Sequence, residues 1–307
     1  MKQHWDLSAM PQLEGKIAIV TGGNSGLGYE TVKAFAQKGA RVIMACRDLA
    51  KGEEAKAQIL KNEIKGSIEV EALDLMSLAS IKNFADKMKA ELPQLNLLIN
   101  NAGIMTTPYF TTSDGFEAQL GTNHLGHFAL SGQLLGLLLK TPKSRIVNVS
   151  SMAHKAGKIH FDNLLFENGK GYQPMKAYAQ SKLANLLFTY ELQRKLNNNK
   201  AETMAVAAHP GVSRTGLMRY IEKYSWFKIG YPVFKLISQT PDMGALPQIR
   251  AAVDANVQGG EYYGPDGFNE MKGHPVKVKS NAASHQAEAA QKLWEVSEKL
   301  TGVTYQF

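Results

Sequence analysis

The stretch TGGNSGLG, residues 21–28, decides the fold; it lies between an apolar run and a helical pattern. Its glycines, Gly22, Gly26 and Gly28, permit a tight turn, a close approach of the backbone to a pyrophosphate, and close packing of the next helix on the preceding strand. The first N–H groups of that helix then face phosphate charge. Three glycines alone are weak evidence, but their position after the first strand of an alternating pattern predicts a dinucleotide-binding turn.

Short apolar runs alternate with longer helical patterns along the chain. The runs are KIAIVT (16–21), RVIMAC (41–46), SIEVEAL (67–73), LNLLIN (95–100), RIVNVS (145–150) and MAVAAH (204–209). Nearly continuous apolar strands separated by helices are typical of a parallel sheet covered on both faces. The sequence therefore predicts an α/β fold with a doubly wound parallel sheet, Rossmann-like, as a single domain over 1–307. A cofactor-binding half is expected at about 14–150, and a catalytic and substrate half at about 151–307.

Three segments interrupt this rhythm: residues 152–174, 216–248 and 260–283. In an open parallel sheet, ligands bind at the carboxyl ends of the strands, where such connections emerge. Many aromatic and aliphatic residues fall within 216–239. They favour a substrate lid over 216–248 that covers an apolar substrate, and ordinary helices packed on the core are an equal alternative.

Composition and charge narrow the classes of protein. The 307 residues carry a formal net charge of +8 and 44% hydrophobic residues, with no block of like charges, so no nucleic-acid partner is expected. Cys46 is the single cysteine, which favours a reducing compartment. The longest apolar runs are too short for a signal peptide or a transmembrane segment, and we expect a cytoplasmic protein. The histidines lack the paired spacing of metal ligands, so no metal site is predicted.

The end of the second run, MACRD (44–48), predicts which dinucleotide binds. NAD-binding units usually place a carboxylate here for the ribose 2′-hydroxyl, whereas an arginine accommodates a 2′-phosphate. Cys46 stands where the acid is expected and Arg47 follows it, so NADP(H) is predicted over NAD(H). Asp48 is the competing acid, but its place before a helical run is that of an N-cap. Asp74, after the third run, has two open roles: accepting from the adenine amino group, or capping the strand end.

With these residues assembled, the chain resembles the short-chain dehydrogenase/reductase family across its whole length. The matching motifs, in order, are TGGNSGLG (21–28), NNAG (100–103), NHLGHF (123–128), NVSS (148–151), YAQSK (178–182) and HPGVSRT (209–215). Within the family, MACRD, NHLGHF, IVNVSSMAH and SKLANLLF are most similar to the retinol dehydrogenase and protochlorophyllide reductase-like branch. Six motifs in order are highly specific.

The resemblance implies a site. The implied catalytic tetrad is Asn123, Ser151, Tyr178 and Lys182. The implied cofactor contacts, beside Arg47 and Asp74, are Gly22, Ser25, Gly26, Leu27, Gly28, Leu75, Asn101, Ala102, Gly103, Tyr178, Lys182, Val212 and Thr215. The 27 residues from Ser151 to Tyr178 leave Ser150 as an alternative to Ser151, and similarity to the VSSxAH pattern favours Ser151. For Asn123, the family role is to position a water, and a structural hydrogen bond is the alternative.

Carbonyl reduction needs a hydride on carbon, which the cofactor supplies, and a proton on oxygen, which the protein must supply. Tyr178 and Lys182 are four residues apart and share one helix face. We expect the ammonium to favour the phenolate and to lower the pKa of Tyr178. The Ser151 hydroxyl would hydrogen-bond the substrate oxygen. The prediction is NADP(H)-dependent hydride transfer on a small apolar aldehyde, ketone or alcohol.

Two other functions stay open. A non-catalytic NADP(H)-sensing or scaffold protein would be expected to lose part of the tetrad, and all four residues are present. A light-dependent protochlorophyllide reductase is expected to carry additional cysteines, and Cys46 is alone. The sequence leaves both a homodimer and a monomer possible.

Overall fold

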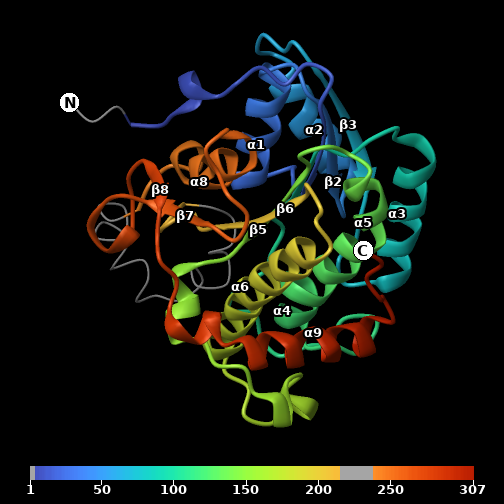
Figure 1. Cartoon of the computed structure of the whole chain (residues 1–307), viewed down its shortest axis with the longest axis vertical. Coiled ribbons are helices and arrows are strands. Elements are labelled where there is room, and N and C mark those ends of the chain that lie inside the picture. Colours follow the sequence, from blue (N-terminus) through green and yellow to red (C-terminus); the bar gives the residue numbers. More distant parts are fainter. Residues whose placement is uncertain (1–3, 215–237) are drawn as a thin grey trace.

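An eight-stranded sheet forms the centre of the computed structural model, which describes residues 4–214 and 238–307. Its strand order is β3-β2-β1-β4-β5-β6-β7-β8, and only β8 runs antiparallel to its neighbour (Figure 1). The strands are β1 Ile17–Thr21, β2 Arg41–Cys46, β3 Ser67–Ala72, β4 Leu97–Asn100, β5 Arg145–Val149, β6 Met204–Ala208, β7 Tyr262–Pro265 and β8 Pro275–Lys277. The doubly wound parallel sheet is confirmed.

Helices cover both faces of the sheet. On one face lie α1 Gly26–Gln37, α2 Leu49–Ile59 and α8 Pro241–Val253; on the other lie α3 Leu78–Glu91, α5 Gly126–Leu139 and α6 Pro174–Asn198. The short α4 Ala118–Leu120 leads into α5 through one π-helical turn, η2 Gly121–Leu125. The 3₁₀ turns are η1 Leu7–Ala9, η3 Met152–Ala156, η4 Phe161–Asn163, η5 Glu167–Gly169, η7 Phe268–Glu270 and η8 Ala282–His285. None of the helices in these described ranges is long and apolar enough to cross a lipid bilayer.

The last helix, α9 Ala287–Thr301, forms an additional outer layer. It packs across α6 and also contacts α5, and Figure 1 shows it crossing the lower part of the molecule below both helices. Trp294 of α9 stacks near Phe188 of α6, with ring centres 5.9 Å apart. The outer faces of α5 and α6 are therefore covered by the chain itself.

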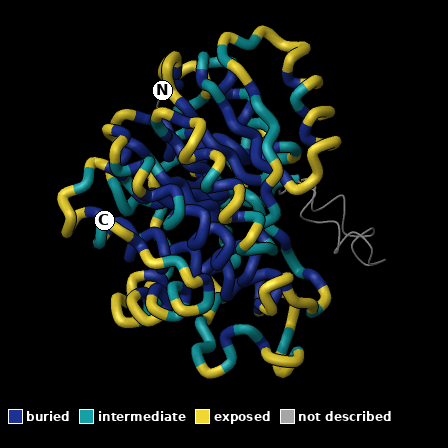
Figure 2. The backbone as a smooth tube through the Cα atoms, turned by 90° about the vertical axis from the view of Figure 1, so that its right-hand side faces the viewer, coloured by how far each residue is buried: buried dark blue, intermediate teal, exposed yellow. Residues whose placement is uncertain are grey.

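Most of the apolar runs form strands that are buried on both faces, and the edge strand β3 is the exception. All residues of β1 and β4 are buried, and Figure 2 shows buried backbone filling the middle of the molecule with exposed residues at its rim. Polar side chains set the helix starts. Asp48 Oδ1 accepts the N–H of Lys51 at 3.2 Å and Ser77 Oγ accepts that of Ser80 at 3.2 Å, as N-caps do.

Two of the interrupting segments have defined structure. Residues 152–174 contain three 3₁₀ turns before α6, and residues 260–283 contain β7 and β8, which the sequence did not predict. Of the expected lid, 216–237 lies outside the described residues. Residues 241–248 are the first half of α8, which packs on α1. Within that part, Ala245 and Leu246 are buried, and the lid stays a prediction.

Candidate active site

A cavity of about 640 Å³ lies at the carboxyl ends of the strands. Five of its lining residues follow five neighbouring strands: Arg47 after β2, Gly22 after β1, Asn101 after β4, Ser150 after β5 and Pro210 after β6. Their order along the cavity is therefore the order of the strands in the sheet. The predicted residues that line it are Gly22, Ser25, Gly26, Leu27, Arg47, Asp74, Leu75, Asn101, Ala102, Gly103, Tyr178 and Lys182.

The glycine turn is shaped to take a phosphate group closely. Gly22 has a φ of +64°, and a Cβ on Gly28 would lie 2.2 Å from the carbonyl oxygen of Gly22, so a side chain at Gly28 would break the turn. Ser25 is the N-cap of α1, and its side chain makes no capping hydrogen bond. The first N–H groups of α1 are thus left for a ligand, and an anion is the ligand that a helix N-terminus favours. This turn fits the pyrophosphate of a dinucleotide.

The β2 end of the cavity carries positive charge. Among the described residues, the Arg47 guanidinium has no carboxylate partner and contacts Met76 Sδ at 3.9 Å. Lys51, which the sequence analysis missed, also lines the cavity, and its Nζ lies 3.2 Å from Asp48 Oδ2. The sequence signal for Lys51 was a basic residue in the first turn of the helix that follows Arg47. Asp48 caps α2, as expected for the competing acid.

Asp74 makes a structural hydrogen bond at the end of β3, and its contact with the adenine amino group stays a prediction. Its Oδ1 accepts the N–H of Met76 at 2.9 Å, so the carboxylate closes the turn after β3. The same residue borders the cavity.

The NNAG segment is fixed to the glycine turn. The Thr21 hydroxyl oxygen accepts the N–H groups of Asn101 and Ala102, both at 2.9 Å, and Asn101 Nδ2 donates to the Thr21 carbonyl at 2.8 Å. A Cβ on Gly103 would lie 3.1 Å from Asn123 Oδ1 and 3.6 Å from Lys182 Nζ. Gly103 therefore sits where Asn123 and Lys182 meet, and its missing side chain leaves that junction open.

Tyr178 and Lys182 lie on the buried face of α6. Lys182 Nζ donates to the Val149 carbonyl at 3.0 Å and lies 5.7 Å from the centre of the Tyr178 ring. Both residues border the cavity near the β5 end. The helix spacing thus brings phenol and ammonium into one site, as the sequence predicts.

The pKa values of this pair differ from the expectation. Burial raises the pKa of Tyr178 to about 12, with a hydrogen bond from Ser151 acting weakly in the opposite direction. Burial also lowers the pKa of Lys182 to about 8. The expected lowering of the Tyr178 pKa is not found for the protein chain alone, because the desolvation of the buried phenolate is the largest effect on this pKa. The phenol is therefore protonated at neutral pH.

The two serines after β5 have different partners. Ser150 is buried and its hydroxyl donates to the Lys182 carbonyl at 2.8 Å. Ser151 interacts through its side chain with Tyr178, and its Oγ accepts the N–H of Ala153 at 3.2 Å. Ser150 is the one whose atoms border the cavity, but its hydroxyl is already engaged. The serine directed at Tyr178 is Ser151.

The Asn123 side chain makes structural hydrogen bonds from the π-helical turn η2. Its Nδ2 donates to the Ile104 carbonyl at 3.0 Å and to Ser181 Oγ at 2.9 Å, and its Oδ1 accepts the N–H of Ile104 at 2.9 Å. The side chain thus has structural partners, and the water-positioning role implied by the resemblance stays a prediction. The side chain joins the NNAG segment to α6 beside Lys182.

Two of the predicted cofactor contacts, Val212 and Thr215, are not among the residues that line the cavity in the described part of the chain. The Val212 N–H donates to the Met271 carbonyl at 2.7 Å, and Thr215 lies outside the described residues. The sequence analysis also missed Thr122, which lines the cavity and whose buried hydroxyl has no hydrogen-bond partner within the described chain. Its place directly before Asn123 was the available signal.

The sequence model of the family described as short chain dehydrogenase matches residues 16–163. Human retinol dehydrogenase 11 is 42% identical over 95% of this chain and 87% of its own length. The chain belongs to the short-chain dehydrogenase family. Human retinol dehydrogenase 14 is likewise 42% identical, over 95% of this chain and 88% of its own length. These relatives place this short-chain dehydrogenase in the retinol dehydrogenase-like branch, and it is an oxidoreductase of alcohol and carbonyl groups.

Solved structures agree with this fold. An uncharacterized protein from Mycobacterium Paratuberculosis has a TM-score of 0.82 at 39% identity, over 99% of this short-chain dehydrogenase and 100% of the other chain. Pseudomonas aeruginosa RhlG, solved as an NADP active-site complex, has a TM-score of 0.65 at 23% identity, over 82% and 94% of the two chains. At that identity the second likeness supports the fold alone.

Proposed function

We propose that this oxidoreductase uses NADP(H) to interconvert a small apolar alcohol and its aldehyde or ketone, with Tyr178 as the general acid and base. The observation that carries this proposal is one cavity with a phosphate-shaped glycine turn and the cations Arg47 and Lys51 at one end and a buried Tyr178–Lys182 pair at the other. Arg47 and Lys51 would bind the 2′-phosphate of the dinucleotide. When bound, the nicotinamide supplies or takes up the hydride.

In reduction, Tyr178 would give its hydroxyl proton to the substrate oxygen as that oxygen gains charge. A pKa of about 12 keeps the phenol protonated beforehand, which suits a proton donor. Ser151 would hydrogen-bond the same oxygen and stabilise the developing charge. Lys182, held by the Val149 carbonyl, would stabilise the phenolate left behind. In oxidation, the phenolate would take the alcohol proton.

The apolar character of the substrate is supported by the relatives, which are named retinol dehydrogenases, and by Ile104 and Met105 on the cavity wall. Cys46, the one cysteine, is buried and fits a reducing compartment, and we propose the cytoplasm.

The test is the loss of NADPH absorbance with a panel of aliphatic, aromatic, retinoid and steroid carbonyls, comparing the unmodified chain with Tyr178→Phe. The expected result is turnover that prefers NADPH over NADH and falls by about 10²–10⁴-fold in Tyr178→Phe, while NADPH affinity is unchanged. Equal turnover in the variant contradicts the role of Tyr178. Tight NADPH binding without turnover on any carbonyl supports the sensing function instead.

A further inference from the structure

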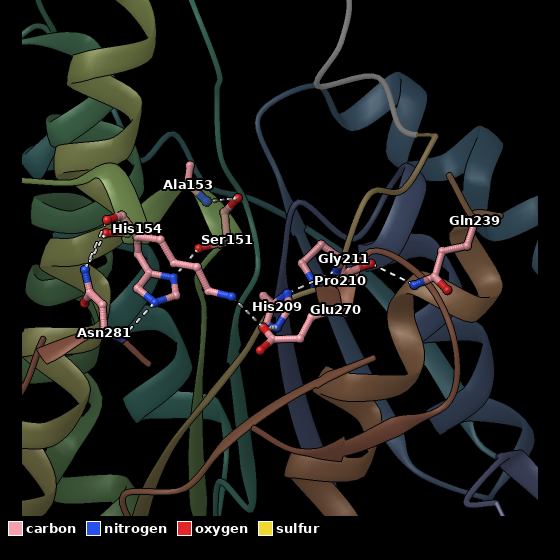
Figure 3. Close-up of polar contacts among 10 residues, drawn as sticks. Ser151, Ala153, His154, His209, Pro210, Gly211, Gln239, Glu270 and Asn281 are labelled. Carbon is pink, nitrogen blue, oxygen red and sulfur yellow. Dashed lines mark hydrogen bonds and ion pairs between the residues drawn. The ribbon is translucent and has the colours of Figure 1, made fainter. Parts of the chain in front are cut away.

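Three loops meet beside the β6 end of the cavity. The carboxylate of Glu270, in one of these loops, contacts a residue of each of the other two. The loops are the turn His209–Val212 after β6, the segment Ser151–Lys155 after β5, and residues 267–272 between β7 and β8. Figure 3 shows Glu270 of the third loop directed at His209 of the first. Glu270 Oε2 lies 3.1 Å from His209 Nε2 and 3.3 Å from Lys155 Nζ.

The partners of His209 fix where its proton lies. The His209 side chain is fully buried, and burial lowers its pKa, so the imidazole is neutral near pH 7. Its Nδ1 accepts the N–H of Gly211 at 3.2 Å, so Nδ1 carries no proton. The proton must therefore be on Nε2, which faces the Glu270 carboxylate. If Nδ1 carried the proton instead, two donors would face each other at Gly211.

The turn that His209 holds is the one that carries Pro210 into the cavity. Hydrogen bonds from two other segments also hold this turn. Gln239 Nε2 donates to the Pro210 carbonyl at 2.8 Å, and the Val212 N–H donates to the Met271 carbonyl at 2.7 Å. A Cβ on Gly211, where φ is +63°, would lie 2.3 Å from the Met271 oxygen. The 267–272 loop and the turn are thus in direct backbone contact.

The 267–272 loop holds a conformation that its residue types disfavour. Asn269 and Glu270 have φ values of +50° and +58°. Glutamate rarely adopts this left-handed region, and such strain persists only where the surroundings fix it, often at functional sites. Here the conformation directs the Glu270 carboxylate inward to His209.

We propose that Glu270 is a positioning residue for the nicotinamide end of the cofactor site. By keeping the proton of His209 on Nε2, Glu270 lets Nδ1 hold the Gly211 N–H, which fixes the Pro210 turn. The strand order puts Arg47 and Pro210 at opposite ends of the cavity, so this effect is confined to the end that carries Tyr178. The role of Glu270 rests on the proposed NADP(H) function.

The experiment compares Glu270→Asn with Glu270→Gln. Asparagine tolerates the left-handed conformation, but its side chain is one methylene too short to reach His209. Glutamine keeps the length and an acceptor oxygen for the Nε2 proton. Glu261→Asn is the matched control, because Glu261 pairs with Lys277 at 2.7 Å in the same part of the chain and does not contact the turn. The affinities for NADPH and for adenosine 2′,5′-bisphosphate, which lacks the nicotinamide, are measured by calorimetry.

We expect Glu270→Asn to weaken NADPH binding by roughly 10-fold or more, with binding of the bisphosphate unchanged. Glu270→Gln and Glu261→Asn keep the affinity of the unmodified chain for both ligands. Unchanged NADPH affinity in Glu270→Asn, or equal weakening of both ligands, overturns the role of Glu270. If the unmodified chain binds neither ligand, the NADP(H) function itself fails, and the role of Glu270 fails with it.

Discussion

Ser150 and Ser151 are adjacent, chemically identical and separable by mutation. Ser151→Ala removes the hydroxyl that interacts with Tyr178, and under the proposed mechanism it removes a donor to the substrate oxygen. Loss of one such donor costs about 10²–10³-fold in kcat, or about 2.7–4 kcal/mol. Its effect on the free energy of unfolding is small, because the hydrogen bond that Ser151 Oγ accepts from the Ala153 N–H, at 3.2 Å, lies in a partly exposed turn.

Ser150→Ala has the opposite profile. It removes the 2.8 Å bond that the buried Lys182 carbonyl accepts from Ser150 in addition to its bond within α6. Loss of one such hydrogen bond costs about 0.5–1.5 kcal/mol, which for a chain of this size lowers Tm by about 1–3 °C. We expect kcat to change by less than about 10-fold, because the hydroxyl itself is not directed at the reacting atoms.

The assay is kcat for NADPH oxidation with the best carbonyl of the panel, together with Tm, for both variants and the unmodified chain. The decisive comparison is the ratio of the two losses in kcat. If Ser150→Ala loses as much kcat as Ser151→Ala or more, while Tm stays unchanged, the assignment of the two serines is wrong.

Three further predictions follow from charge, burial and packing. Arg47→Ala should raise the KM for NADPH by roughly 10–100-fold by removing a charge-assisted contact to the 2′-phosphate, while the KM for NADH stays constant; an equal rise for both cofactors contradicts the role of Arg47. Burial lowers the pKa values of His124 and His127 to about 3 and about 4. Between pH 6.5 and pH 4 the unfolded chain therefore binds more protons than the folded chain. The free energy of unfolding decreases as the pH is lowered through this range, by up to about 1.4 kcal/mol per pH unit for each histidine. Urea unfolding of His127→Gln should show a shallower pH slope, and an unchanged slope refutes the contribution of His127. Because α9 covers α5 and α6, light scattering should give the mass of one chain, and a stable dimer whose interface includes these two helices would refute this.

The sequence predicted the parts of the fold that have a strong local signal. All six apolar runs became parallel strands within two residues of their expected bounds, because a strand buried on both faces needs apolar residues on both. The sequence did not predict β7 and β8 because both strands are short and carry Gly264, Pro265 and Pro275. Glycine and proline are depleted in strands. Their pairing depends on contact with β6 rather than on local preference.

Within the site, the spacing of Tyr178 and Lys182 predicted that they meet, but not which of them determines the pKa of the other. Coulomb attraction between two groups four residues apart can be read from a sequence, whereas the desolvation of both depends on the whole fold around α6. The same limit applies to Asn123, whose amide partners, Ile104 and Ser181, come from two other segments. Residue type thus predicts the chemistry available, and burial decides its energetics.

Glu270 marks the point where sequence reading ends. Nothing near it in the sequence pairs it with His209, and its left-handed φ of +58° is one that a glutamate does not predict. That conformation exists because the Val212 N–H, Gly211 and Lys155 all contact the 267–272 loop once β6 and β7 are paired. The proposed role of Glu270 therefore depends on contacts made by the folded sheet and its loops, and no sequence motif indicates it. The proposed role of Arg47 rests on a local sequence pattern, whereas the proposed role of Glu270 depends on contacts that only the assembled strands create.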